Sequence, residues 1–173
     1  MTRSTIRLDI FSDPVCPWCF VGKTHLDRAL ADHPDHPFAI QWHPFQLNPD
    51  IPTEGVEKRA YLEAKFGGKA QVDAIHDRLR EVARAAGVAL NPDAPQRQPN
   101  TLDAHRLIHW AGIEGRETQT RVVDLLFKAN FEQGRNIGET AVLLDIATEA
   151  GLSRPVIESL LSGDADVNHV LSE

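Results

Sequence analysis

The two cysteines of the chain, Cys16 and Cys19, are separated by two residues in the sequence Cys-Pro-Trp-Cys. They follow an apolar run at residues 6–11 and precede a segment with helical periodicity, so a strand should deliver Cys16 to the start of a helix. There the helix dipole and the unpaired amides would lower the pKa of the Cys16 thiol. Thiolates attack disulfides, and Cys19, one turn later, could resolve the mixed disulfide. The spacing therefore predicts a redox-active dithiol.

Two other uses of a cysteine pair are less consistent with the sequence. A structural disulfide would close a very short loop in a chain of 173 residues and add little stability, and nothing marks the chain for an oxidising compartment. A zinc site would need two further ligands. His105 and His109 lie four residues apart on a predicted helix, but their distance from Cys19 in sequence matches no compact zinc finger. We therefore expect no metal site.

Composition bounds the class of protein. With 42% hydrophobic residues, the chain can bury a substantial core as one domain or as a domain with an insertion. The net charge of −7 and the absence of a long basic run argue against nucleic acid or anionic membrane as partners. No apolar segment reaches the length of a signal peptide near the amino terminus or of a membrane span elsewhere. We expect a soluble cytoplasmic protein.

The periodicity predicts a strand-helix-strand opening followed by helices. A strand at residues 5–11, expected to be buried on both faces, precedes the helix that contains Cys19, and a second strand covers residues 38–45. The crossover is long enough for a parallel pair. After a connector at residues 46–52 no further strand is predicted, and Asn100 is expected to cap a helix that runs from residue 101 to about 111. The other predicted helices end at Gly67, Gly87, Gly134, Gly151 and Gly163.

Three separated motifs resemble the DsbA-like oxidoreductases of the FrnE type. They are Phe-Ser-Asp-Pro-Val-Cys-Pro-Trp-Cys at residues 11–19, Phe-Gln-Leu-Asn-Pro at residues 45–49, and Asn-Thr followed by Ala-His-Arg-Leu at residues 100–107. Those oxidoreductases are similar to 2-hydroxychromene-2-carboxylate isomerases and kappa-class glutathione transferases. The resemblance covers nearly the whole chain and implies an α/β fold, thioredoxin-like with a large inserted α-helical subdomain.

The resemblance also implies a division of the chain. Residues 1–47 would form the strand-helix-strand part of a thioredoxin-like domain, residues 48–163 the inserted helical subdomain, and residues 164–173 an incomplete return to the first domain. Family members continue through two strands, a cis-proline loop and a final helix, which have no counterpart before Glu173. We therefore expect the C-terminal strands and helix of the fold to be missing from these residues.

For the site, the resemblance implies Cys16 as the nucleophile and Cys19 as the resolving thiol. Pro17 and Trp18 would tune the dithiol and line its cleft, and the segment from Asn100 to His105 would line the opposite side. For His105 an equally good interpretation is that the ring fills a gap in the core, because a lone histidine serves either use.

The predicted function is thiol-disulfide oxidoreductase, oxidising, reducing or isomerising disulfides of proteins or small thiols without a bound cofactor, and with glutathione as a candidate redox partner. The first alternative is a glutathione-dependent isomerase or transferase, although those relatives generally use serine where this chain has Cys16. The second alternative is a non-catalytic binding or chaperone-like module. The sequence leaves the oligomeric state open, and a dimer is one option.

Overall fold

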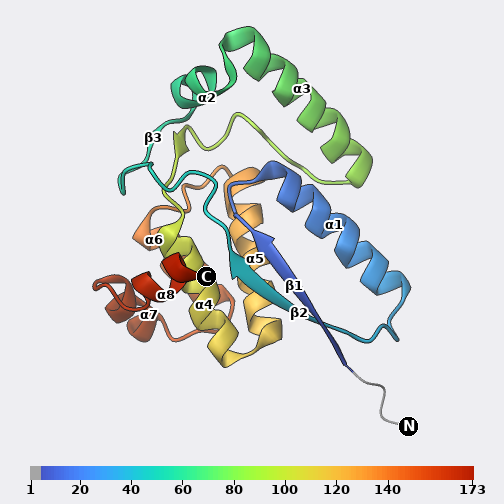
Figure 1. Ribbon diagram of the computed structural model, residues 1–173, viewed down its shortest axis with the longest axis vertical. Helices are drawn as coiled ribbons and strands as arrows, with labels where there is room; N and C mark the ends of the chain where they lie inside the picture. Colours follow the sequence, from blue (N-terminus) through green and yellow to red (C-terminus); the bar gives the residue numbers. More distant parts are fainter. Residues whose placement is uncertain (1–4) are drawn as a thin grey trace.

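The computed structural model describes residues 5–173, and its first three elements are those that the sequence predicts (Figure 1). Strand β1 (Ile6–Ser12), helix α1 (Pro17–Asp32) and strand β2 (Phe38–Pro44) follow one another, and the two strands pair in parallel. The register places Ile6 opposite Phe38 and Ser12 opposite Pro44. Residues 1–4 of the predicted first domain lie outside the described residues.

The remaining elements confirm the predicted helices and add three short elements that were not predicted. The additions are a two-stranded antiparallel sheet of two residues per strand and the last helix, and such short elements have too few residues to show a period. The full series is β3 (Val56–Glu57), α2 (Lys58–Phe66), α3 (Lys69–Ala86), β4 (Arg97–Gln98), α4 (Leu102–Glu114), α5 (Arg116–Phe131), α6 (Thr140–Glu149), α7 (Arg154–Leu161) and α8 (Val167–Ser172).

Local sequence signals explain where several helices begin and end. Helices α2 and α3 stop at Gly67 (φ 91°) and Gly87 (φ 75°), in the left-handed region that glycine adopts without steric cost. The predicted cap of α4 is off by one residue, because Thr101 and not Asn100 is its N-cap. Asn100 still satisfies the first turn, since its Oδ1 accepts the Leu102 amide at 2.9 Å.

The helices that follow β2 form two groups beside the β1–β2 pair (Figure 1). Helices α4 and α5 pack against each other and against β2, and α6, α7 and α8 lie beside them. Helices α2 and α3 form a separate layer that reaches the rest of the molecule where α3 packs on α1. This arrangement brings α2 and α3 to the carboxyl end of β1, where the chain enters α1.

At Trp42, a side chain bonds to the outer edge of β2. Gln119 of α5 is buried, and its Oε1 accepts the Trp42 amide at 3.0 Å while its Nε2 donates to the Trp42 carbonyl at 3.1 Å. The amide of Gln119 thus makes at Trp42 the two bonds that a neighbouring strand would make. Trp42 is itself fixed, because its Nε1 donates to Thr120 Oγ1 at 3.0 Å.

Strand β1 is more exposed than the sequence suggests. Its apolar run predicts burial on both faces, but Ile6 and Phe11 are 51% and 57% exposed, and that expectation is wrong. Within residues 5–173 the strand pairs only with β2, so one edge and much of one face stay open. Phe11 instead stacks on His43 of β2, with ring centroids 4.9 Å apart.

Among the described residues, no helix is long and apolar enough to cross a membrane.

Candidate active site

Cys16 is the N-cap of α1. The turn before it is closed by the Cys16 amide, which donates to the Asp13 carbonyl at 2.8 Å, and Pro17 occupies the first turn of the helix, where no amide hydrogen is needed. The Cys16 sulfur accepts the amide hydrogen of Cys19, with N and Sγ 3.4 Å apart. A thiol side chain thus takes the place that a serine or aspartate oxygen usually has at a helix start.

A hydrogen bond between the two sulfurs governs the titration of the dithiol. It raises the pKa of Cys16, together with burial, and it lowers the pKa of Cys19 to about 6 against the opposing effect of burial. Because interacting groups titrate as a pair, the dithiol loses its first proton well below the ordinary cysteine value and its second well above it. The sequence predicts the lowered pKa at Cys16; because the two thiols titrate as a pair, the lowered pKa belongs to the dithiol.

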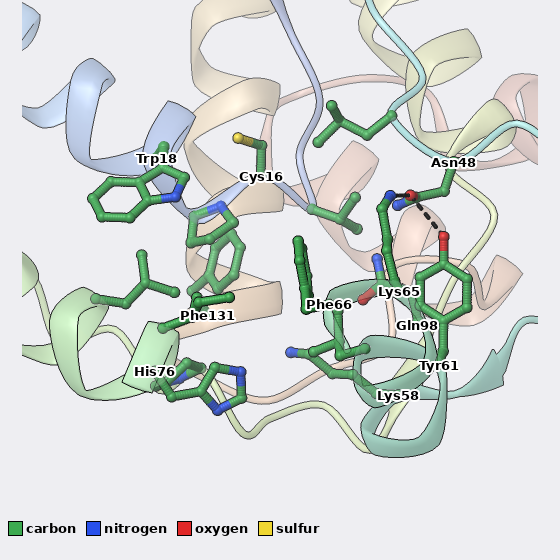
Figure 2. Close-up of a pocket in the computed structure, with 17 residues that line it drawn as sticks. Cys16, Trp18, Asn48, Lys58, Tyr61, Lys65, Phe66, His76, Gln98 and Phe131 are labelled. Carbon is green, nitrogen blue, oxygen red and sulfur yellow. Dashed lines mark hydrogen bonds between the residues drawn. The ribbon is translucent and has the colours of Figure 1, made fainter. Parts of the chain in front are cut away.

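Cys16 opens onto a pocket of about 260 Å³. Figure 2 shows Cys16 and Trp18 on one side of this pocket and Lys58 and His76 on the other. Cys19, one turn further along α1, is not among the residues that line it. The apolar part of the lining comes from the turn before α1, from α1, α2, α3 and α5, and from the connectors after β2 and α3. It consists of Val15, Pro17, Trp18, Leu47, Leu62, Phe66, Ile75, Leu79, Pro92 and Phe131.

The polar side chains of the pocket are held by hydrogen bonds. Tyr61 donates to Asn48 Oδ1 at 2.8 Å, and Lys65 donates to the same oxygen (Figure 2). Deeper in, Lys58 Nζ donates to the Ala94 carbonyl at 2.9 Å. His76 Nδ1 lies 2.9 Å from Asp93 Oδ1. The far wall of the pocket is therefore basic and positionally fixed.

Behind the dithiol, Asp13 connects the site to α4. Its Oδ2 accepts the Leu47 amide at 2.8 Å and Thr101 Oγ1 at 3.3 Å, and its Oδ1 lies 3.6 Å from His105 Nε2. Asp13 and His105 are each 1% exposed, and neither ring nitrogen of His105 has a hydrogen-bond partner. A buried carboxylate, three residues before Cys16, and a buried imidazole of α4 therefore face each other.

The structure separates the predicted site residues into two groups. Cys16, Pro17 and Trp18 line the pocket, whereas Asn100 and His105 do not. Asn100 holds the connector after β2, because its Nδ2 donates to the Ile51 carbonyl at 2.6 Å and its Oδ1 accepts from Gln46 at 3.1 Å. In residues 5–173, no group of three or more histidine, cysteine, aspartate or glutamate side chains is arranged to hold a metal ion.

Sequence reasoning missed the far wall of the pocket. His76 carried a signal, because it lies on the apolar face of α3 beside Val72 and Leu79, where a polar residue is unexpected. Lys58 carried none, because a lysine at the start of a helix is ordinary. Both line the pocket because α2 packs on α3 and α3 packs on α1, which local periodicity does not encode.

Comparison with known proteins gives a consistent result. A family model described as the DSBA-like thioredoxin domain matches residues 7–173. The uncharacterized protein YwbO of Bacillus subtilis is 28% identical over 159 residues, which are 91% of this chain and 72% of that protein. The crystal structure of a probable DsbA oxidoreductase from Streptomyces coelicolor is 30% identical with a TM-score of 0.83, over 96% of this chain and 72% of that one.

More distant solved structures share the fold. A 2-hydroxychromene-2-carboxylate isomerase superimposes with a TM-score of 0.71 at 16% identity, over 96% of this chain and 76% of the isomerase. The cytosolic disulfide reductase DsbM of Pseudomonas aeruginosa superimposes with a TM-score of 0.67 at 17% identity, over 96% of this chain and 76% of DsbM. DsbM has also been solved with GSH.

Proposed function

The chain belongs to the DSBA-like thioredoxin domain family, and we propose that it is a thiol-disulfide oxidoreductase that works through Cys16 and Cys19. The observation that carries this proposal is the position of Cys16. Its sulfur lies at the start of α1, accepts the Cys19 amide and bonds to the second sulfur, and the residue lines a pocket. A sulfur so placed can attack a bound disulfide and be attacked in turn by its neighbour.

The reaction proceeds in two exchanges. In the reduced pair the shared proton first moves along the hydrogen bond from Cys16 to Cys19, which leaves a Cys16 thiolate that the Cys19 amide stabilises. This thiolate attacks one sulfur of the substrate disulfide, forms a mixed disulfide and expels the other sulfur as a thiolate, which takes up a proton. Cys19 then loses its proton, attacks the Cys16 sulfur and releases the second substrate thiolate. The substrate gains two electrons, and the enzyme retains the Cys16–Cys19 disulfide.

A small thiol such as glutathione closes the cycle by reducing that disulfide, and in the reverse direction the same steps oxidise a dithiol substrate. The structure of DsbM with GSH supports glutathione as such a partner, and the cytosolic location of DsbM supports a cytoplasmic location for this chain. Disulfide-containing proteins are the other substrate class that we propose.

Within this proposal, His105 is a positioning residue that acts through Asp13. The negative charge of Asp13 raises the pKa of Cys19. This effect is smaller than the effects of the sulfur–sulfur hydrogen bond, of burial and of two further hydrogen bonds. The imidazole of His105 places Nε2 3.6 Å from that carboxylate, and an N–H at this position would reduce the field of Asp13 at the sulfur. Asn100 has a related role, because it fixes the connector whose Leu47 and Asn48 line the pocket.

Replacing His105 by Ala is therefore expected to raise the pH at which the dithiol loses its first proton above the present value of about 6. Alkylation of the reduced protein by iodoacetamide as a function of pH measures this midpoint. His105→Gln, whose amide can donate to Asp13, should restore most of the shift, and His109→Ala, on the same helix, should leave the midpoint in place. An unchanged midpoint in His105→Ala would contradict the positioning role and favour simple filling of the core.

A glutathione-dependent isomerase is a second candidate function. The likeness of the fold to a 2-hydroxychromene-2-carboxylate isomerase favours it, and so does an apolar pocket with Trp18 and Tyr61 that could receive an aromatic substrate. A non-catalytic binding module is the remaining alternative.

One experiment separates the three. The purified protein is assayed for reduction of insulin and of a small disulfide with glutathione as the electron donor, and in parallel for conjugation or isomerisation of aromatic electrophiles with glutathione. We expect turnover only in the first pair of assays. Turnover only with the aromatic electrophiles would favour the isomerase or transferase, and no turnover in any assay would favour the binding module.

A further inference from the structure

The pocket at Cys16 has a charge opposite to that of the chain. The chain carries 25 acidic and 18 basic residues, for a net charge of −7. None of the 17 residues that line the pocket is Asp or Glu, whereas Lys58, Lys65 and His76 are among them. Lys58 and His76 lie across the pocket from Cys16 (Figure 2). The local field therefore favours an anion beside the dithiol.

Lys58 is the buried member of this group. The residue is 8% exposed, and its ammonium group donates to one neutral acceptor, the Ala94 carbonyl. Among the described residues it forms no ion pair. Burial lowers the pKa of Lys58 to about 8, and the charge of Asp93 only partly counteracts this effect. Asp93 itself is engaged by His76 and Arg80, which leaves it no close contact with Lys58.

The other buried lysine of the chain provides a direct contrast. Lys23 is 5% exposed, and its ammonium group lies 2.6 Å from Asp27 and 3.2 Å from Asp124, so two carboxylates balance its charge. A buried ammonium group without such a partner is costly unless a ligand supplies the negative charge. Lys58, unlike Lys23, is among the residues that line the pocket at Cys16. The unbalanced charge is thus located where a substrate would bind.

From this geometry we infer that Lys58 binds an anionic group of the substrate, so that the dithiol prefers small disulfides and thiols that carry a carboxylate near the sulfur. The inference rests on the proposed oxidoreductase function and specifies its substrate class. The apolar walls formed by Leu62, Phe66 and Leu79 would contact the chain that links the sulfur to the carboxylate. A cationic substrate of the same size would be repelled from the same wall.

Three disulfides of similar length test the inference: 3,3′-dithiodipropionate, which is a dianion, bis(2-hydroxyethyl) disulfide, which is neutral, and cystamine, which is a dication. Each disulfide is mixed with the reduced protein at pH 7. The loss of the thiolate absorbance of the dithiol follows the oxidation and gives its second-order rate constant. We expect the dianion to react at least about tenfold faster than the dication, the gain typical of a charge-assisted hydrogen bond. Lys58→Gln should lose about tenfold with the dianion and much less with the neutral disulfide.

Two variants and a change of pH complete the test. Lys69→Gln removes the same charge from an exposed position on α3 outside the pocket and should leave the rate ratios unchanged, and Lys58→Arg should keep the preference. The ratio of dianion to neutral rates, in which cysteine ionisation cancels, should fall as the pH rises through about 8, where Lys58 loses its proton. Equal rate ratios in the unmodified protein and Lys58→Gln would overturn the inference. Failure of all three disulfides to oxidise the protein would instead overturn the proposed function.

Discussion

Replacing Cys16 by Ser is expected to lower the rate of disulfide reduction by more than about a thousandfold, because a serine hydroxyl is not ionised at neutral pH and cannot form the mixed disulfide. Cys19→Ser should have a different result. Its Cys16 can still attack, but the resolving sulfur is gone, so mixed disulfides between the protein and its substrate should accumulate. Activity is measured as the reduction of a small disulfide, and the trapped species by mass spectrometry of the intact protein.

The two variants also distinguish ionisation from access as the factor that decides which cysteine attacks. Cys19 has the lowered pKa, of about 6, and the pKa of Cys16 is raised, so reactivity judged from ionisation alone would favour attack by Cys19. Access favours Cys16, because of the two cysteines only Cys16 is among the residues that line the pocket. If access decides, Cys19→Ser traps the substrate. Trapping by Cys16→Ser together with full inactivity of Cys19→Ser would show that ionisation decides and that the two roles are exchanged.

The parts of the fold that the sequence predicts well are those with local causes. The strand-helix-strand opening follows from apolar runs of suitable length, and the ends of α2 and α3 follow from Gly67 and Gly87. The placement of Cys16 at a helix start follows from the adjacent Pro17. None of these features depends on which helix packs on which.

The features that could not be predicted depend on contacts between distant segments. Lys58 and His76 reach the pocket because α3 packs on α1, and no pattern within α2 or α3 specifies that partner. The hydrogen bond between the two sulfurs depends on two side-chain conformations, so the helix dipole alone does not specify how the pair titrates. His105 was expected in the cleft with a core role as the equal alternative, and the structure buries it against Asp13.

One further residue connects the distant helices to the dithiol. Phe127 of α5 is fully buried, and its ring lies 5.3 Å from that of Phe20, the residue after Cys19, in a stacked arrangement. Phe20 also stacks on Phe131, with centroids 5.8 Å apart, and Phe131 lines the pocket. The three rings thus hold the first turn of α1 against α5. Removing the Phe127 ring should affect both stability and the site.

Phe127→Ala is expected to lower the free energy of unfolding by about 3–5 kcal/mol, because the buried ring leaves a cavity that the surrounding helices fill only in part. Urea denaturation followed by circular dichroism measures the change. Phe45→Ala provides the matched control: Phe45 is 55% exposed, so its loss should cost less than about 1 kcal/mol. Phe127→Leu, which refills much of the volume, should recover a large part of the stability.

The expected size of the effect reflects what the ring supports. The first turn of α1 carries Cys16, Cys19 and the amide that bonds to the Cys16 sulfur, and Phe20 fixes that turn through its stacking on α5. A shift of the turn would alter the sulfur–sulfur hydrogen bond, on which the lowered pKa of Cys19 depends. Phe127→Ala should therefore also move the alkylation midpoint of the dithiol upward, whereas Phe45→Ala should not. Equal losses of stability in the two variants would show that the aromatic stack does not hold the dithiol turn in place.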